Sequence, residues 1–367
     1  MRKKKLLHIV EAMGGGVFTY IVELSNRLVE KYDIYIAYAT RPQTPENFRD
    51  YFDDRIKLIE VENFSRSVNA LSDVKAFFEI KNIVKKIKPD VVHLHSSKAG
   101  ALGRWGINGR KIPMFYTPHG FSFLMADQSK LKLKIYKFIE KFCAVRKCTT
   151  IACSKGEYIE AKSLNKKATY VNNGINIKEL ENTIKTIQKK NLDNFTVFTL
   201  GRICYQKNPE LFNSIAKSMP NVKFLWIGDG ELRSKLTSEN IEITGWVDRE
   251  TALKYALSVD VFMLTSLWEG LPMSLLEAMY MEKLCIVSRV IGNKDVIKTS
   301  YNGFCCENKE DFIEAINYAK EQDCSKLISN AKNEVLSQYN TGVMAEKYDE
   351  IYSKSINNCF RSMKEYY

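Results

Sequence analysis

Two glutamates, Glu269 and Glu277, stand with seven residues between them in the stretch 265-TSLWEGLPMSLLEAMYMEKLCIVS-288. The first precedes a Gly-Leu-Pro turn, and Pro272 favours the first turn of a helix that we expect to run to about Lys283. The second lies inside an apolar helical pattern, but helical side chains lean toward the N-terminus of their helix. Both carboxylates can therefore reach one ligand, and such a pair suits the hydroxyls of a sugar or a ribose. Each glutamate alone would also suit an exposed position on a surface helix.

The turn between the two glutamates offers hydrogen-bond donors. Gly270 lets the backbone approach a ligand closely. The N–H groups of Leu271, Met273 and Ser274 would point out of the helix start, where an anion or a hydroxyl can bind.

Two cations precede this stretch along the chain. Arg202 follows an apolar run, and Asn208 suits the cap of a helix with Pro209 in its first position. Arg202 and Lys207 would then flank a helix start, where two fixed cations suit a diphosphate. Taken alone, they would equally suit a solvated surface.

A triple glycine, Gly14-Gly15-Gly16, joins the first apolar run to a helical pattern. Such a turn exposes backbone N–H groups to an anion. It does not match the GxGxxG pattern of dinucleotide-binding proteins, and Asp33 opens the next strand rather than ending it, so a nicotinamide cofactor is disfavoured. A purely structural turn is the alternative.

The chain has four histidines. His119 stands in the context Thr-Pro-His-Gly at an expected strand end, where it would stabilise a reacting group or simply satisfy the local structure. His95 could line an acceptor site. We expect His93 to alternate to the other face of its strand, in the core, and His8 to lie inside the first strand.

Short apolar runs alternate with helical patterns, which indicates parallel sheets covered by helices on both faces. The runs fall into two series: 6–10, 33–40, 90–96, 114–119 and 149–154, then 195–201, 222–230, 241–246, 259–266 and 284–288. We predict an α/β protein with two Rossmann-like domains, 1–180 and 190–342, facing across a cleft. A polar segment, 178–194, separates them, and a helix within 343–367 returns to the first domain. Ligands bind beyond the carboxyl ends of parallel strands, so the candidate residues should gather there.

The length and composition of the chain agree with two globular domains. A length of 367 residues exceeds one typical core, and 45% hydrophobic with 27% charged residues is ordinary for a globular protein. The nine cysteines form no CxxC pair, which disfavours a zinc cluster and favours free thiols in a reducing compartment. No apolar run reaches the length of a signal peptide or a spanning helix, so we expect a cytoplasmic protein. A net charge of +12 favours an anionic partner: nucleic acid, a membrane surface or a phosphorylated substrate.

A lysine-rich helical pattern occupies 130–142. On a helix, one stripe would hold four lysines and an adjacent stripe four apolar residues, namely Lys130, Lys134, Lys137 and Lys141 beside Leu131, Ile135, Phe138 and Phe142. This arrangement suits a helix that lies on the anionic inner face of the cell membrane. An ordinary amphipathic helix packed on the sheet is the alternative.

Four motifs, in this order, resemble those of the retaining glycosyltransferases of family 4, which have the two-domain glycosyltransferase-B (GT-B) fold: 201-GRICYQKNP-209, 226-WIGDGEL-232, 245-GWV-247 and 269-EGLPMSLLE-277. The segments 14-GGG-16, 90-DVVHLHSSKAG-100 and 118-PHG-120 agree with the same family. The last two resemble bacterial capsule and exopolysaccharide transferases.

The resemblance implies substrates and roles. The second domain would bind a nucleotide-sugar, with uridine as the favoured base, and the first would bind a saccharide linked to a polyprenyl diphosphate. Arg202 and Lys207 would stabilise the leaving diphosphate, which Gly16 would approach from the first domain. The other donor contacts would be the ribose at Glu277, the base at Trp246 and Val247, and the sugar at Glu269, Gly270, Leu271, Pro272 and Met273. His119 would lie beside the transferred sugar and His95 on the acceptor side.

The expected mechanism follows from these roles. Departure of the diphosphate would leave an oxocarbenium-like sugar. Without an obvious carboxylate nucleophile, we expect attack on the face that the phosphate leaves, with the phosphate taking the acceptor's proton. No DxD-like pair of carboxylates stands at a strand end, so we expect neither a metal nor a cofactor.

Three other functions stay open. A sugar-nucleotide epimerase or hydrolase on the same fold would consume the donor without an acceptor. A nicotinamide-dependent oxidoreductase is opposed by the glycine pattern. A nucleic-acid binder would gather its cations in one patch with interleaved aromatics, whereas here they are scattered, so we expect no nucleic-acid partner.

Overall fold

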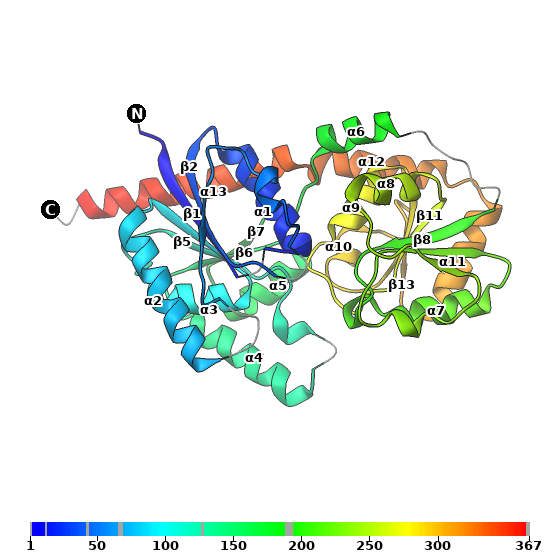
Figure 1. The fold of residues 1–367 in the computed structure, drawn as a ribbon, viewed down its shortest axis with the longest axis horizontal. Helices are drawn as coiled ribbons and strands as arrows, with labels where there is room; N and C mark the ends of the chain where they lie inside the picture. Colours follow the sequence, from blue (N-terminus) through cyan, green and yellow to red (C-terminus); the bar gives the residue numbers. More distant parts are fainter. Residues whose placement is uncertain are drawn as a thin grey trace. The chain divides into compact units, whose positions relative to one another are not determined.

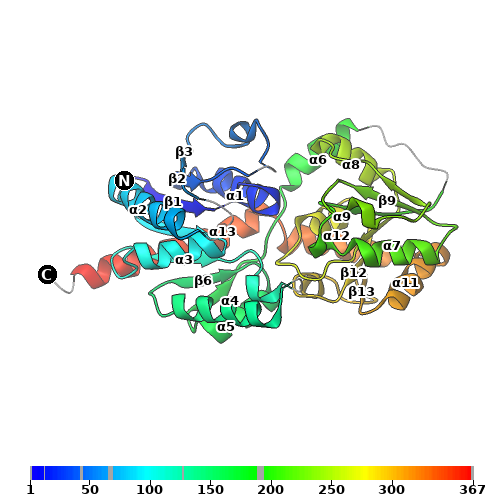
Figure 2. The ribbon, with the colours of Figure 1, turned by 60° about the horizontal axis from the view of Figure 1, so that its bottom comes forward.

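The computed structural model of the chain divides into two units, each described here by itself (Figures 1 and 2). Unit 1 comprises Met1–Leu124, Ser129–Asn173 and Thr341–Tyr367, and unit 2 comprises Met125–Gln128 and Gly174–Asn340. The structure describes residues 2–11, 13–41, 44–64, 69–125, 128–187 and 194–364, with side chains up to 359. The chain enters unit 2 before the boundary expected from the sequence, because α6 (Ile177–Thr186) already belongs to that unit. Residues 188–193 of the expected linker lie outside the described part.

Unit 1 is built on a parallel sheet with the strand order β3-β2-β1-β4-β5-β6-β7. In that order the strands are β3 (Lys57–Glu60), β2 (Tyr32–Tyr38), β1 (Lys4–Val10), β4 (Val91–His95), β5 (Met114–Thr117), β6 (Thr149–Ala152) and β7 (Ala168–Tyr170). Strand order runs outward from β1 in one direction and from β4 in the other. The crevice between the ends of these two strands is therefore the topological switch point, where open α/β sheets bind ligands.

Helices cover both faces of this sheet, which explains the almost continuous apolar runs of β1 and β4. One face packs against α1 (Gly15–Leu28) and α13 (Thr341–Lys364). The other packs against α2 (Ala70–Ile87), α3 (Ser97–Gly106) and α5 (Lys155–Leu164), and α4 (Lys130–Cys143) packs on α3. The unit also contains two 3₁₀ turns, η1 (Phe48–Tyr51) and η2 (Ser122–Leu124).

The last helix of the chain lies beside the first elements. Figure 1 shows α13 in red against α1 and β1 in blue. Tyr348 and Tyr352 of α13 are fully buried, and their hydroxyls bind Tyr20 and His93, respectively. The helix is thus an integral part of the core of unit 1.

Unit 2 has a parallel sheet with the order β10-β9-β8-β11-β12-β13. The strands are β10 (Ile241–Ile243), β9 (Lys223–Ile227), β8 (Thr196–Leu200), β11 (Val261–Leu264), β12 (Leu284–Ser288) and β13 (Phe304–Cys306). Its switch point lies between β8 and β11. The remaining elements are α7 (Pro209–Ser218), α8 (Arg249–Leu257), α9 (Met273–Tyr280), α10 (Asn293–Val296), α11 (Lys309–Glu321), α12 (Ser325–Gln338), η3 (Tyr205–Lys207) and η4 (Arg233–Lys235).

The prediction of two parallel α/β sheets is confirmed, and every apolar run named above contains a strand. Three strands were not predicted: β3, β7 and β13, each of three or four residues. All three are edge strands, which bury less surface and so need no long apolar run. Among the described residues, no helix has both the length and the apolar character needed to span a membrane.

Candidate active site

The switch point of unit 2 holds an ion pair between two of the predicted residues. Lys207 Nζ lies 2.6 Å from Glu269 Oε1, and both side chains are largely buried. Ser266 Oγ donates to the same oxygen at 2.6 Å, and Gln206 Nε2 donates to Oε2 at 3.3 Å. The carboxylate of Glu269 is thereby fixed at the end of β11, with a cation beside it from the end of β8. Sequence reasoning missed Gln206 and Ser266.

The turn after Glu269 differs from the expectation. Pro272 has φ −74° and ψ 126° and precedes α9, whereas we expected it in the first turn. The helix ends at Tyr280 rather than near Lys283, because Glu282 adopts a left-handed φ of 59°. Pro272 is therefore an extended residue that aims the chain into the helix.

The turn at Gly270 is held in place by backbone packing. A Cβ added at Gly292 would meet the carbonyl oxygen of Gly270 at 2.5 Å. Gly292 also has φ +86°, a conformation that other residues rarely adopt. The Gly270 turn therefore rests directly on the loop after β12.

Glu277 is buried in α9 and binds Arg249, whose guanidinium nitrogen lies 2.9 Å from its carboxylate. Arg249 is the first residue of α8 and follows the segment with Trp246 and Val247. Trp246 is 65% exposed and Val247 is half-buried. The ion pair thus links the residue expected to hold the ribose to the segment expected to meet the base. Arg249 was not predicted, although it is a cation at a helix start just after a family motif.

Arg202 lies at the end of β8 and pairs with Glu231 at 3.0 Å, both side chains being substantially exposed. The loop that carries Arg202 is fixed by the loop after β9. Ile203 N donates to Asp229 O at 2.8 Å, and a Cβ at Gly228 would meet Gly201 O at 2.3 Å. This close approach requires glycine at 228, and the φ of +145° at Gly201 favours glycine there.

The predicted cap of α7 is confirmed. Asn208 accepts a hydrogen bond from Leu211 N, and Pro209 occupies the start of the helix. Asn208 itself has φ 51°, so the chain turns sharply just after Lys207.

In unit 1, the triple glycine forms the start of α1. Gly14 is the N-cap without a side-chain hydrogen bond, and Gly15 has φ +56°. A Cβ at Gly15 or Gly16 would meet no atom within 4 Å. Side chains of unit 1 therefore do not crowd the first turn of α1 at these two glycines.

His119 follows β5 with a left-handed φ of 55°, a strained conformation for a residue with a side chain. The loop is fixed by the buried carboxylate of Glu157, which accepts from Gly120 N at 2.6 Å and from Cys153 N at 2.7 Å. Sequence reasoning missed Glu157, although Ser154 and Glu157 have the spacing of a helix capping box.

The other histidines correct two expectations. His93 and His95 lie two residues apart on β4 and therefore point to the same face, so the expected alternation was wrong. His95 is fully buried and both its ring nitrogens bind histidine nitrogens, so its side chain lies inside unit 1 rather than along an acceptor surface. His8 lies within β1 as predicted.

Burial keeps these rings neutral. It lowers the pKa of His8 and of His119 from 6.5 to about 3. Burial, and then repulsion by the other histidines, holds the pKa of His93 and His95 well below 6.5. At neutral pH each imidazole therefore carries one N–H and one lone pair.

The helix α4 presents its apolar stripe to solvent within unit 1. Leu131, Ile135, Phe138 and Phe142 are 69%, 47%, 68% and 53% exposed, and Lys130, Lys134, Lys137 and Lys141 are also exposed. The helix is anchored instead by the buried Glu140, which lies 2.8 Å from Arg104 and accepts from Tyr116 at 2.7 Å. The expectation of an apolar stripe packed on the sheet is thus excluded.

Comparison with known proteins agrees with this architecture. Residues 14–179 match the family model Glycosyltransferase Family 4, and residues 181–334 match Glycosyl transferases group 1. The chain is 31% identical over 344 residues to UDP-Gal:alpha-D-GlcNAc-diphosphoundecaprenol alpha-1,3-galactosyltransferase of Escherichia coli, covering 84% of this chain and 87% of that protein.

Solved structures share the fold over the whole length. Sucrose-phosphate synthase of Thermosynechococcus elongatus superposes with a TM-score of 0.77 at 16% identity, covering 96% of this chain and 99% of the other. Anabaena HepE in complex with UDP and glucose gives 0.73 at 15% identity, covering 96% and 100%. Together with the two family models and the E. coli relative, this places the chain among the glycosyltransferases of family 4, with the GT-B fold.

Proposed function

We propose that this glycosyltransferase moves a sugar from a UDP-sugar to a saccharide linked to a polyprenyl diphosphate, with retention of anomeric configuration and without a metal ion, in the assembly of a capsule or a related surface polysaccharide. The observation that carries the proposal is the ion pair of Lys207 with Glu269 at the switch point of unit 2. A fixed cation and a fixed carboxylate at one strand end suit a ligand that has both a diphosphate and sugar hydroxyls.

The choice of substrates is supported by the relatives. The name of the E. coli relative gives a UDP-linked donor, an acceptor on diphosphoundecaprenol and an alpha linkage in the product. HepE was solved with UDP and glucose. We propose the same kinds of donor, acceptor and linkage for the present chain.

Lys207 and Arg202 would stabilise the negative charge that develops on the leaving diphosphate. Lys207 is held at the strand end by Glu269, so its charge is already in place before the donor arrives. Preorganised charge of this kind accelerates bond breaking because no reorganisation is needed during the reaction. These two cations would supply the charge stabilisation that a metal ion supplies in other transferases.

Glu269 would accept hydrogen bonds from sugar hydroxyls rather than attack the anomeric carbon. Its two carboxylate oxygens already accept from Lys207, Ser266 and Gln206, which makes it a weak nucleophile. The acceptor hydroxyl would then attack on the face from which the phosphate departs, and the phosphate oxygen would take its proton. This route retains the configuration.

The acceptor would reach the enzyme at a membrane surface through α4. The exposed apolar stripe of that helix is flanked by four exposed lysines, a combination that favours binding to anionic lipid. Trp105 extends the apolar surface, since its ring stacks on Phe142 with 4.8 Å between centroids. The enzyme would thus be peripheral to the inner face of the membrane.

Thermal unfolding with UDP, GDP, ADP, CDP and NAD, each with and without EDTA, tests the donor site. A ligand at 100 times its Kd stabilises by about 2.7 kcal/mol. We expect a shift with UDP that persists in EDTA and is lost in Lys207→Met. The matched control is Lys217→Met, an exposed lysine at the end of α7, which should keep the shift. A shift with NAD alone, or none with UDP, would contradict the proposal.

Incubation with the UDP-sugar and a lipid-linked saccharide separates transfer from the alternative activities. Transfer predicts that donor consumption depends on the acceptor. Equal consumption without the acceptor would identify an epimerase or a hydrolase instead.

Co-sedimentation with anionic liposomes at low salt tests the membrane surface. We expect binding that weakens with salt and is lost when Phe138 and Phe142 are both changed to serine. The control is Leu71→Ser on α2, another helix of unit 1, where the apolar side chain of Leu71 is 79% exposed. Equal loss in the control, or no binding by the wild type, would rule out α4 as the docking surface.

A further inference from the structure

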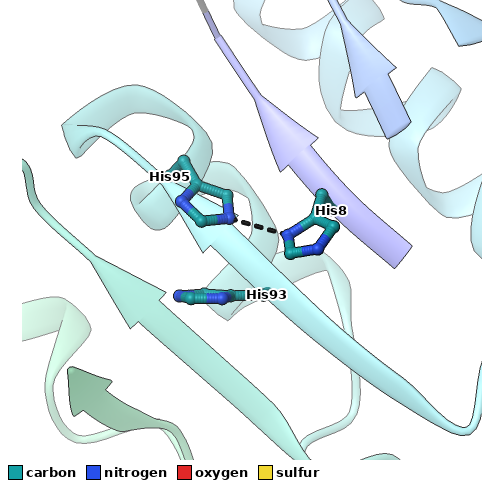
Figure 3. A group of neighbouring side chains, drawn as sticks. All are labelled: His8, His93 and His95. Carbon is teal, nitrogen blue, oxygen red and sulfur yellow. Dashed lines mark hydrogen bonds between the residues drawn. The ribbon is translucent and has the colours of Figure 1, made fainter. Parts of the chain in front are cut away.

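All four histidines of the chain gather at the switch point of unit 1. Figure 3 shows the rings of His8, His93 and His95, with the hydrogen bond between His8 and His95 dashed. His8 Nδ1 lies 2.9 Å from His95 Nε2, and His95 Nδ1 lies 3.0 Å from His119 Nε2. His119 Nδ1 lies 3.5 Å from Cys153 Sγ. Three imidazoles thus form one chain of hydrogen bonds, which we call the histidine chain (His8, His95 and His119).

The two N···N bonds couple the tautomers of the three rings. A neutral imidazole has one N–H and one lone pair, and a bond between two ring nitrogens needs one of each. If His8 carries its proton on Nδ1, it donates to His95, which must then donate from Nδ1 to His119. His119 in turn must carry its proton on Nδ1. The opposite choice at His8 reverses all three rings.

The inner end of the histidine chain decides between these two states. His8 Nε2 is buried and has no hydrogen-bond partner among the described residues. With the proton on Nδ1, this orphan atom is a lone pair; with the opposite tautomer, it is an N–H without an acceptor. Buried N–H groups without a partner are the rarer of the two in proteins. The state with Nδ1–H at His8 is therefore favoured, and with it Nδ1–H at His119.

We infer that His8 and His95 are positioning residues that hold His119 as the neutral Nδ1–H tautomer, so that it presents an N–H donor at the carboxyl end of β5. This is opposite to the tautomer that free histidine favours in water. The contact of His119 Nδ1 with Cys153 Sγ is weaker than the two bonds between ring nitrogens, because a thiol sulfur is a poor acceptor.

A metal site is the competing interpretation of this cluster. One ring nitrogen from each of His8, His93 and His95 lies within 4.8 Å of the others. However, both nitrogens of His95 bind other histidines, and both nitrogens of His93 bind the hydroxyls of Tyr352 and Thr117. A metal would have to break several of these bonds, so the arrangement fits neutral hydrogen-bonded rings better.

The tautomer can be measured directly by long-range proton–nitrogen correlation NMR on protein with ¹⁵N-labelled histidine at pH 7. Only four histidines contribute, and single substitutions assign them. We expect the proton of His119 on Nδ1 in the wild type. In His8→Asp an ionised carboxylate can only accept, so His95 must donate from Nε2 and accept at Nδ1, and His119 should shift to the Nε2–H form. In His8→Asn the side-chain amide can replace the Nδ1–H donor, and the wild-type tautomer should persist.

Three results would overturn the inference: Nε2–H at His119 in the wild type, a charged imidazolium there at pH 7, or one equivalent of tightly bound metal that is lost in His8→Asn. The wild-type spectrum alone decides the first two, so the inference stays testable even if His8→Asp does not fold. It needs no substrate and is therefore independent of the proposed transfer reaction.

The kinetic consequence rests on the proposed function, in which His119 lies beside the transferred sugar. We expect kcat to fall about tenfold or more in His8→Asp, which is the scale of loss for residues that orient a side chain in contact with the substrate. KM for the donor should change little, and His8→Asn should restore kcat. The matched control is His93→Gln, an equally buried residue of the same cluster outside the histidine chain. An equal loss of kcat in His93→Gln would show a general structural effect and contradict the positioning role.

Discussion

Replacing Lys207 by methionine separates its catalytic role from its structural one. Methionine keeps much of the apolar stem but removes Nζ, which lies 2.6 Å from Glu269 Oε1. Glu269 would keep its bonds from Ser266 and Gln206, so its carboxylate would not be left wholly unpaired. The expected loss of stability is therefore that of one charged hydrogen bond, about 1.5–3 kcal/mol, rather than the 3–5 kcal/mol typical of a broken buried pair.

The catalytic loss should be larger. Lys207 supplies a fixed positive charge where the diphosphate leaves, and removal of one such preorganised group lowers kcat by about 10²–10³-fold. In the double variant Lys207→Met with Glu269→Gln, the stability losses should be less than additive, because each single change removes the same ion pair. Activity should not recover, because the charge that stabilises the leaving group is still missing.

The assay is release of UDP from the accepted UDP-sugar, with urea unfolding on the same samples. Lys217→Met serves as the control for loss of one positive charge. A folded Lys207→Met enzyme with less than a tenfold loss of kcat would refute the role in leaving-group stabilisation. Strictly additive stability losses in the double variant would refute the ion pair itself.

Three further changes test the framework around the site. Arg104→Leu leaves the buried Glu140 with the hydroxyl of Tyr116 as its partner, so urea unfolding should show a loss of about 3–5 kcal/mol. The double variant Arg104→Leu with Glu140→Leu should largely restore that stability. Burial lowers the pKa of His8 to about 3, so below pH 6.5 the unfolded state takes up this proton before the folded state does. His8 therefore contributes a loss of about 1.4 kcal/mol of folding stability per pH unit below pH 6.5, and the other three histidines, whose pKa values are also lowered, add to it. In urea titrations between pH 7 and 5, His8→Asn should reduce the slope by the contribution of that one residue. Gly292→Ala should weaken UDP binding in thermal-shift titrations by displacing the Gly270 turn, and wild-type affinity in this variant would show that the turn does not contact the donor.

Features that depend on neighbouring residues could be predicted from the sequence. Contacts between side chains that are far apart in the sequence could not. The Asn208-Pro209 cap depends on adjacent residues, and it was predicted correctly. The strands were predicted from apolar runs, except for the edge strands β3, β7 and β13. By contrast, the partners Lys207 with Glu269 and Glu277 with Arg249 are separated by many residues, and only the order of the strands brings them together.

The helical spacing of apolar residues also does not show whether the apolar face of a helix is buried or exposed. The stripe of α4 that contains Phe138 has the same spacing whether a sheet or solvent covers it, and the structure shows it exposed. His93 could have been placed correctly, since residues two apart on a strand share a face. The link from His8 to His119 was not predictable, because it depends on the register of β1 beside β4 and on the left-handed turn after β5.

The anomeric configuration of the product distinguishes retaining transfer from inverting transfer. The UDP-α-sugar that the enzyme accepts would be incubated in EDTA with a saccharide on polyprenyl diphosphate, and the new linkage would be read from its anomeric coupling constant by NMR. Retaining transfer without a metal ion predicts an α linkage that forms at an undiminished rate in EDTA. A β linkage, or transfer that requires an added divalent cation, would contradict it.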